Sequence, residues 1–449
     1  MSFPRYPAYK DSGLAWLGEV PTHWGLSQSR RLFQERKDRA TEGDRQLTAS
    51  QKHGVIYQDD FMALEGQKVM QVIHGADILK RAEPNDFVIS MRSFQGGIEW
   101  CGLAGSISSA YVMLIPDDSV VPGYFRYLFK SSRYVQALQS TTNLVRDGQA
   151  LRFANFVLVD LPVVPRQEQT AIATFLDHET AKIDALVTEQ ERLIELLKEK
   201  RQAVISHAVT KGLDPSVPMK DSGVEWLGEV PAHWEVARVK QLVKTIEQGW
   251  SPQCESFPVG SESEWGVLKV GCVNGGIFNP EENKALPPDL TPLPELGISA
   301  GDLLISRANT RELVGSAAAA TSDHHNLMLC DKLYRLRVDA GRCLPTFLSL
   351  FLGTEQVRGQ IELAATGASS SMLNISQATI LELCLALPPM AEQQELLQAV
   401  DVSVAQLDQL VGEVVLSSEL LRERRTALIS AAVTGQIDVR GWTPPTDAP

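Results

Sequence analysis

Long apolar runs are missing from this sequence. In 449 residues there is no stretch of about 18 uncharged apolar residues, so we expect no membrane-spanning helix. The opening residues, MSFPRYPAYKDSG, lack the apolar core of a signal peptide, which favours a location in the cytoplasm. The six cysteines form no CxxC pair, so free thiols in a reducing compartment are expected.

Motifs for catalysis and metal binding are missing as well. The chain has no GxxxxGK[ST] phosphate loop, no GxGxxG, and no HExxH or HxxxH zinc pattern. The [DN]PP[FY] motif of amino-methyltransferases is also absent, because Asn279-Pro280-Glu281 lacks the second proline and the aromatic residue. The sequence therefore predicts a binding protein without a catalytic site, a cofactor or a metal of its own.

An overall positive charge is lacking too. The formal net charge is −13, and it is divided into −1 for residues 1–218 and −12 for residues 219–449. Proteins that bind nucleic acid unaided usually carry a basic surface. Any contact with DNA must therefore come from a local patch or be helped by a partner.

The sequence does contain a duplicated stretch. KDSGLAWLGEVPTHW (10–24) returns as KDSGVEWLGEVPAHW (220–234), with twelve of fifteen positions identical. Trp16, Leu17, Val20 and Trp24 favour a structural role, in which the motif attaches the start of each domain to its core. No nucleophile accompanies His23 at a specific spacing, so packing is again the simpler interpretation.

A second repeat is longer. Residues 168–214 align without gaps with residues 392–438, with 20 identities in 47 positions. Apolar residues recur in both at alternating steps of three and four, the spacing of a coiled-coil seam, so the two segments are predicted to pack as antiparallel helices. The predicted seam and partner-binding residues are Ile172, Leu176, Ile183, Leu186, Leu193, Leu197, Leu396, Val400, Leu407, Leu410, Leu421 and Leu428.

The segments between the repeats predict domains of mixed α/β fold. Residues 84–91, 109–116 and 301–306 have strand character, and residues 124–138 and 346–361 look helical. We expect two pseudo-twofold-related globular domains separated by two long helices packed as an antiparallel coiled coil. The predicted boundaries are 1–160 for the first globular domain, 161–218 for the first helix and linker, 219–386 for the second domain, and 387–449 for the second helix and the C-terminal tail.

Polar stretches near the predicted strands are candidates for DNA contact. Arginine, glutamine and asparagine can recognise base edges through paired hydrogen bonds, and small polar residues suit phosphates. The alternative, an ordinary polar loop, stays open for each residue. The candidates are Arg30, Arg31, Arg92, Ser93, Gln95, Arg146, Arg307, Asn309, Thr310, Arg311, Ser369 and Ser370.

As an ordered set, these motifs resemble the specificity (S) subunit of type I restriction–modification enzymes. The set comprises KDSGxxWLGEVPxHW twice, ISMRSFQGGIEW, SRANTRELVG, and EQ-led helices ending in AVTKGLD and AVTGQID. The resemblance implies two target-recognition domains that each read one half of a split double-stranded DNA site. It also implies helices that dock two methyltransferase subunits, with restriction subunits joining the full complex.

The same resemblance places the chemistry in other chains. S-adenosylmethionine for adenine-N6 methylation would bind the methyltransferase subunit, and ATP and magnesium would bind the restriction subunit. A non-catalytic two-headed protein scaffold is the alternative, and the acidic second half of the chain favours it. A self-sufficient nuclease-methyltransferase is a third reading, opposed by the missing motifs.

Overall fold

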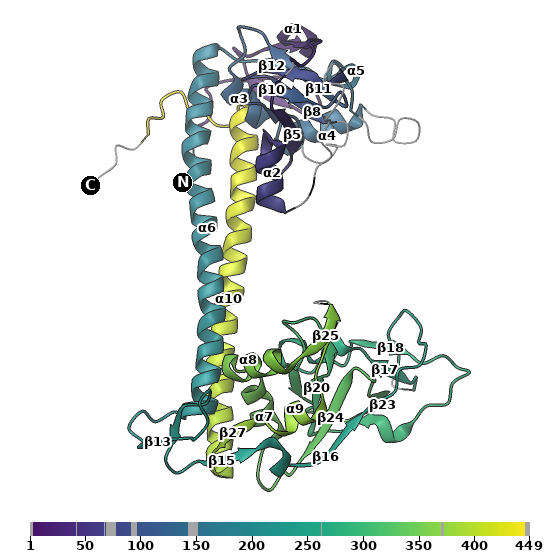
Figure 1. The fold of residues 1–449 in the computed structure, drawn as a ribbon. Coiled ribbons are helices and arrows are strands. Elements are labelled where there is room, and N and C mark those ends of the chain that lie inside the picture. The colour runs from purple at the N-terminus through teal and green to yellow at the C-terminus, as the bar shows by residue number, and fades with distance from the viewer. Residues whose placement is uncertain are drawn as a thin grey trace. The chain divides into compact units, whose positions relative to one another are not determined.

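The computed structural model describes residues 3–444 except 42, 67, 69–77, 91–96, 142–150, 262 and 370–371, and describes 368 and 369 by their backbone alone. The fold is mixed α/β, as predicted (Figure 1). The chain divides into two compact units, Met1–Glu191 with Val415–Pro449, and Arg192–Val414. Within the described residues, no helix is both long and apolar enough to cross a membrane.

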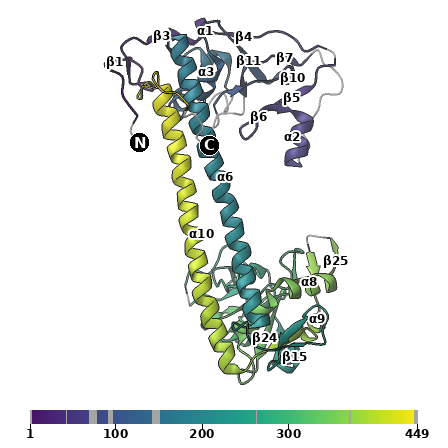
Figure 2. The same ribbon diagram turned by 90° about the vertical axis from the view of Figure 1, so that its left-hand side faces the viewer.

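Two long helices contribute to both units. They are α6 (Arg166–Lys211) and α10 (Met390–Val433), and neither contains a proline. In the first unit, Asp184 of α6 pairs with Arg425 at 2.8 Å, and Glu191 pairs with Arg422 at 2.6 Å. Residue numbers rise along α6 as they fall along α10, so the helix segments in this unit are antiparallel (Figure 2). In the second unit, Arg201 pairs with Asp408 at 3.1 Å.

The interhelical seam follows steps of four and three residues. In the first unit, its buried and half-buried positions are Leu176, Thr180, Ile183, Val187 and Gln190 on α6, and Ser418, Leu421, Arg425 and Leu428 on α10. In the second unit, they are Ile194, Leu197, Arg201, Val404, Leu407, Val411 and Val414. At every second step, the residue in the seam is the one that follows the predicted residue. Leu186, Leu193 and Leu410 therefore lie beside the seam, with 40–45% of their surface exposed.

The first unit contains two four-stranded sheets. One has the order β4 (Phe33–Glu35), β11 (Tyr111–Pro116), β8 (Phe87–Ser90), β9 (Glu99–Trp100). The other has the order β6 (Gly54–Tyr57), β5 (Gln46–Ser50), β10 (Gly105–Ile107), β7 (Lys80–Ala82). Two antiparallel pairs, β1 (Tyr9–Asp11) with β2 (Glu19–Pro21) and β3 (Gly25–Gln28) with β12 (Asp160–Val163), complete the strands. The helices are α1 (Ser29–Leu32), α2 (Gln58–Glu65), α3 (Pro122–Leu128), α4 (Ser132–Ser140) and α5 (Phe153–Phe156).

The second unit repeats this strand order. Its first sheet is β16 (Val243–Gln248), β24 (Leu333–Val338), β20 (Asp302–Ser306), β22 (Ala317–Ala319). Its second sheet is β18 (Asn283–Ala285), β17 (Gly266–Leu268), β23 (His324–Met328), β19 (Gly297–Ile298), and the inner pairs β17–β23 and β5–β10 are both parallel. The pairs β13 (Met219–Asp221) with β14 (Glu229–Pro231) and β15 (Glu235–Arg238) with β27 (Cys384–Leu387) match those of the first unit.

Further elements of the second unit surround these sheets. β21 (Ala308–Asn309), β26 (Met372–Asn374) and β25 (Thr366–Ser369) form a three-stranded sheet. The helices are α7 (Pro345–Leu352), α8 (Glu355–Ala364) and α9 (Gln377–Leu381), with 3₁₀ turns at Val239–Gln241, Val270–Gly276 and Pro294–Leu296. The shared strand order shows that the variable segments, which differ strongly in sequence, keep one topology.

Two of the predicted helices are broken. The segment predicted as a helix over 124–138 is α3 followed by α4, and the segment predicted over 346–361 is α7 followed by α8. At the breaks, Ser131 Oγ donates to the Leu128 carbonyl at 2.7 Å and Thr354 Oγ1 donates to the Phe351 carbonyl at 2.8 Å. These hydroxyl groups take up carbonyls that the end of a helix leaves without partners, which stabilises the break.

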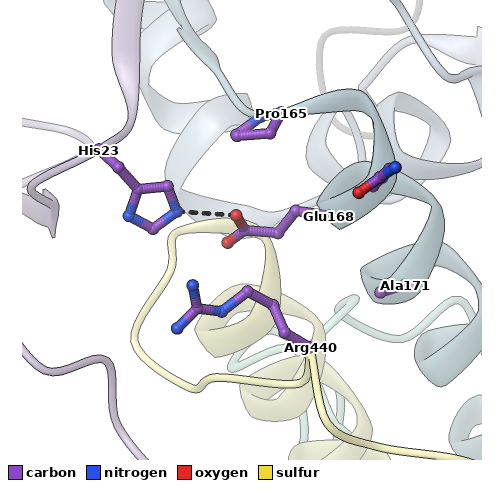
Figure 3. Close-up of a pocket in the computed structure, with 6 residues that line it drawn as sticks. His23, Pro165, Glu168, Ala171 and Arg440 are labelled. Atoms are coloured by element: carbon purple, nitrogen blue, oxygen red, sulfur yellow. Dashed lines mark hydrogen bonds and ion pairs between the residues drawn. The ribbon is translucent and has the colours of Figure 1, made fainter.

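The duplicated motif anchors each sheet domain to the start of a long helix. In the first unit, Trp24 Nε1 donates to Glu168 Oε1 at 2.9 Å, and His23 Nε2 lies 2.8 Å from Glu168 Oε2 (Figure 3). In the second unit, Trp234 and His233 contact Glu392 at 3.0 and 2.8 Å. We call these contacts the first and second clamps. They agree with the structural role expected for the motif.

The end of the other long helix closes the first clamp. Gly435 follows α10 with φ +73°, and a Cβ there would lie 2.5 Å from Pro21 and 3.0 Å from Trp24. A glycine is therefore needed both for the left-handed backbone and for the close approach. The clamp thus joins the motif, the start of α6 and the end of α10 within one unit.

Candidate nucleic-acid interface

Three strand ends of the second unit meet at one edge of the sheet. β16 ends at Gln248, β20 ends at Ser306 and is followed by Arg307, and Asp331-Lys332 precedes β24. Because β24 runs antiparallel to both neighbours, its start lies beside their ends, with Gln248 opposite Tyr334 and Ser306 opposite Leu333. We call Gln248, Arg307, Asp331 and Lys332 the polar edge.

Hydrogen bonds hold the side chains of Gln248, Arg307 and Asp331 in the polar edge. The Asp331 carbonyl accepts from Arg307 Nη1 at 3.1 Å and from Gln248 Nε2 at 3.0 Å. The Asp331 carboxylate accepts from the Ser251 hydroxyl, whose oxygen in turn accepts the Asp331 N–H at 3.1 Å. Polar groups of three segments are thereby held around one residue.

A glycine allows these segments to approach. A Cβ at position 249 would lie only 1.9 Å from the Leu329 carbonyl oxygen. Gly249 therefore brings the chain after β16 directly against the segment that leads to Asp331.

The structure joins two stretches that were predicted to contact DNA. β21 pairs with β26 and β26 pairs with β25, so Asn309 lies in the same small sheet as the backbone of Ser369. Asn309 Nδ2 donates to Ser306 Oγ at 3.3 Å, and its Oδ1 accepts from the Thr310 N–H at 2.9 Å. Arg311 is exposed and has no ion-pair partner among the residues that the structure describes. Ser370 lies outside the described residues.

In the first unit, the predicted candidates are separated. Arg30 and Arg31 are exposed on α1, and Arg30 Nε donates to Gln28 Oε1 at 2.9 Å. α1 leads into β4 at Phe33, which lies opposite Pro116, whereas Ser90 lies opposite Tyr111 at the other end of β11. The arginines are therefore not at the sheet edge that corresponds to the polar edge. Arg92, Ser93, Gln95 and Arg146 lie outside the described residues.

Arg36, another basic residue of this segment, has a structural role. Its guanidinium donates to both oxygens of buried Asp86, at 2.7 and 2.9 Å, and these hydrogen bonds to Asp86 raise the pKa of Arg36. Asp86 also accepts from the Glu83 N–H, as Asp302 does from the Ser299 N–H in the second unit. An arginine already committed to a buried carboxylate is a poor candidate for DNA contact, while its neighbour Lys37 is exposed.

All six cysteines are free thiols, and burial raises the pKa of Cys101 and of Cys330 to about 11. Among the described residues, no group of three histidine, cysteine, aspartate or glutamate side chains is placed to hold a metal ion.

Comparison with known sequences identifies the relatives of the chain. No family model matches. The chain is 27% identical over 241 residues to the EcoEI specificity subunit of Escherichia coli, covering 54% of this chain and 40% of that one. It is 24% identical over 371 residues to the EcoKI specificity subunit of Escherichia coli K12, covering 80% and 76%. The StySPI specificity subunit of Salmonella potsdam is 23% identical, with 80% and 76% covered.

The chain is homologous to type I restriction enzyme specificity subunits. This confirms the resemblance predicted from its motifs. Among solved structures, the HsdS subunit of Thermoanaerobacter tengcongensis matches with a TM-score of 0.53 at 15% identity, covering 93% of this chain and 98% of that one. A chain from work on the assembly and conformational transition of the type I R-M system matches with a TM-score of 0.67 at 14% identity, covering 92% and 98%. The fold is therefore that of specificity subunits.

Sequence reasoning missed three members of the polar edge. In this homologue of specificity subunits, Arg307 was among the predicted DNA contacts, whereas Gln248, Asp331 and Lys332 were not. A signal was present, since Gln248-Gly249-Trp250-Ser251 is a polar, glycine-containing stretch at the end of a strand-like run. Strand order was needed to bring it next to Arg307.

Proposed function

We propose that the chain is the DNA sequence-recognition subunit of a type I restriction–modification complex and is not catalytic alone. The observation that carries this proposal is the similarity to named specificity subunits over 80% of the chain. The polar edge supports it, because guanidinium and carboxamide groups at a sheet edge can hydrogen-bond to base edges. Each unit would read one half of a bipartite site in double-stranded DNA.

Two methyltransferase subunits and the restriction subunits are the proposed protein partners, and the cytoplasm is the proposed location. S-adenosylmethionine would belong to the methyltransferase, and ATP and magnesium to the restriction subunit. Methyltransferase subunits could also supply phosphate contacts that an acidic chain lacks.

Exposed leucines beside the helical seam support docking on the long helices. Leu186 and Leu420 in the first unit are 45% and 56% exposed, and Leu410 and Leu196 in the second are 45% and 51% exposed. Leu186 corresponds to Leu410, and Leu196 to Leu420, at the repeat offset of 224. A surface that occurs twice at equivalent positions fits two copies of one partner.

Within each unit, the two leucines share one side of the helix pair. Each directly precedes a seam residue, whereas Asp184, Glu191, Asp408 and Arg422, which form interhelical ion pairs, directly follow one. One residue turns a helix by about 100°, so the two sets lie on opposite sides of the seam. The apolar side would receive the partner.

Mapping of N6-methyladenine in cells tests the proposal. We expect a two-part motif with a fixed gap that appears only when the chain and its methyltransferase are both present. Exchange of residues 25–160 for the same segment of another specificity subunit should change one half of the motif and leave the other half unchanged. Methylation that is unaffected by the chain, with an active methyltransferase, would favour the two-headed scaffold instead.

A further inference from the structure

The Asp331 carbonyl holds two side chains of the kinds that recognise purines. Arg307 and Gln248 come from different strands, yet both donate to this one oxygen, at 3.1 and 3.0 Å. A side chain that is already held by a hydrogen bond within the protein loses less conformational entropy when it binds a ligand. Asp331 therefore orients the Arg307 guanidinium and the Gln248 carboxamide for contact with a ligand outside the protein.

Both side chains keep the hydrogen-bonding capacity that such a contact needs. A guanidinium has five N–H donors, and one of the Arg307 donors is used by Asp331. A carboxamide has two N–H donors and an acceptor oxygen, so Gln248 retains one donor together with its oxygen. Gln248 is exposed and Arg307 is partly exposed.

The remaining donor and acceptor patterns match different bases. Paired N–H donors of arginine suit O6 and N7 of guanine, and the oxygen and N–H of glutamine suit N6 and N7 of adenine. Because both side chains are tied to one carbonyl, the bases that they reach must be close together in one half-site.

We propose that Gln248 and Arg307 read two nearby purines of one half-site, and that Asp331 is the positioning residue for both. This inference rests on the proposed function. The Asp331 carbonyl makes the two contacts, and the bond between its carboxylate and Ser251 fixes the segment that carries the carbonyl. Loss of that bond should therefore disturb two base positions together.

The test is the methylation motif produced by the full chain assembled with its methyltransferase. Gln248→Ala and Arg307→Ala should each relax a different position of the same half-site, with roughly 10- to 100-fold loss of discrimination. Asp331→Ala and Ser251→Ala should each relax both of those positions, and the double variant should be no worse than either. Asp331→Asn keeps an oxygen that accepts from Ser251, so it should retain the wild-type motif.

Matched controls separate the possible failures. Lys244→Ala, at the other end of β16, should leave the motif unchanged, and thermal unfolding of every variant should stay near the wild-type midpoint. An unchanged motif in Asp331→Ala, or relaxation of positions other than those of Gln248→Ala and Arg307→Ala, would overturn the inference. Uniformly weaker DNA binding with a shallower salt dependence would assign these residues to phosphates and would also overturn it. A wild-type complex without any motif would instead refute the proposed function.

Discussion

Single carboxylates at the helix starts anchor both sheet domains, but they do so in different surroundings. Glu168 is 4% exposed and accepts from Tyr6 as well as from Trp24, whereas Glu392 is 28% exposed. Removal of a buried acceptor leaves its donors without a hydrogen-bond partner. When the acceptor is partly exposed, water can take its place. The duplicated sequence thus gives two clamps of unequal expected strength.

The first prediction compares these two clamps. Glu168→Ala should lower the free energy of unfolding by about 1–3 kcal/mol for each buried donor that it leaves without a partner. Glu392→Ala should lower the free energy of unfolding by less. Urea unfolding of the full chain measures both variants. Equal losses would show that exposure does not distinguish the clamps.

A second prediction concerns the thiols. Burial raises the pKa of Cys343 to about 12 and that of Cys101 to about 11, so these thiols stay protonated and covered. Cys254 and Cys384 are partly exposed. A colorimetric thiol reagent at pH 8 should label these two quickly and the other four only after denaturation; rapid labelling of all six would contradict the described burial.

A third prediction concerns Arg311, an exposed arginine four residues after Arg307 in the chain. If it makes a paired contact with a base, Arg311→Ala should cost about 1–3 kcal/mol of discrimination and relax one position of the motif. Methylation mapping of the assembled complex checks this. An unchanged motif would remove Arg311 from the set of base-reading residues.

At this scale, the sequence predicted part of the polar edge but not how the candidates are grouped in space. Arg307 and Asn309 follow the end of β20 at the polar edge, whereas Arg30 and Arg31 precede β4, at the opposite end of their sheet. Gln248 and Asp331 were missed because they are 83 residues apart in the chain and meet only through strand order. All of the predicted DNA contacts stay predictions, and those at 92, 93, 95, 146 and 370 lie outside the described residues.

Among the elements, the long helices show how a correct period can leave the register open. A repeat of 3.5 residues allows steps of three then four or of four then three. Apolar residues stand at both of the alternative positions, as at Leu186 and Val187, so the sequence does not decide between them. The structure selects the later residue because the antiparallel partner covers it. The leucines left outside the seam are then available to another protein.

The fourth prediction tests that apolar side. Glutamate at both Leu186 and Leu420 should reduce the number of methyltransferase subunits bound per chain from the proposed two to one, and adding Leu196→Glu and Leu410→Glu should abolish binding. Burying a carboxylate in an apolar contact is costly, whereas these exposed sites tolerate charge in the free chain. Mass measurement of the purified complexes gives the stoichiometry.

Val415→Glu is the matched control for these leucines. Val415 is 40% exposed, but it follows the seam residue Val414 and so lies on the side of the ion pairs. Binding of two methyltransferase subunits should survive this change. Loss of binding in the control, or its retention in the fourfold variant, would place the docking surface elsewhere.

For the whole molecule, duplication in the sequence predicted duplication of the fold, even where the variable segments had diverged. The shared strand order of the two units agrees with that expectation. The division of each long helix between two units could not be predicted, because helical periodicity is the same along its whole length. As a result, each unit is assembled from both halves of the chain.

A fifth prediction follows from this assembly. A protease site inserted in the exposed linker after Pro215 should allow cleavage into two fragments that remain together during gel filtration. The core of the first unit contains Ile172 from one fragment and Leu428 from the other, and that of the second contains Val209 and Leu396. Separation of the fragments without denaturant would contradict the described cores.

The clamps also have a genetic consequence. The residues of the first clamp, namely Tyr6, His23, Trp24, Glu168 and Gly435, all lie outside residues 25–160. Recombination within the stretches that encode the motif and the start of the helix could therefore replace the intervening segment while every residue of the clamp is kept. A cell could in this way inherit a new target sequence in a single event, while the clamp of the protein is kept.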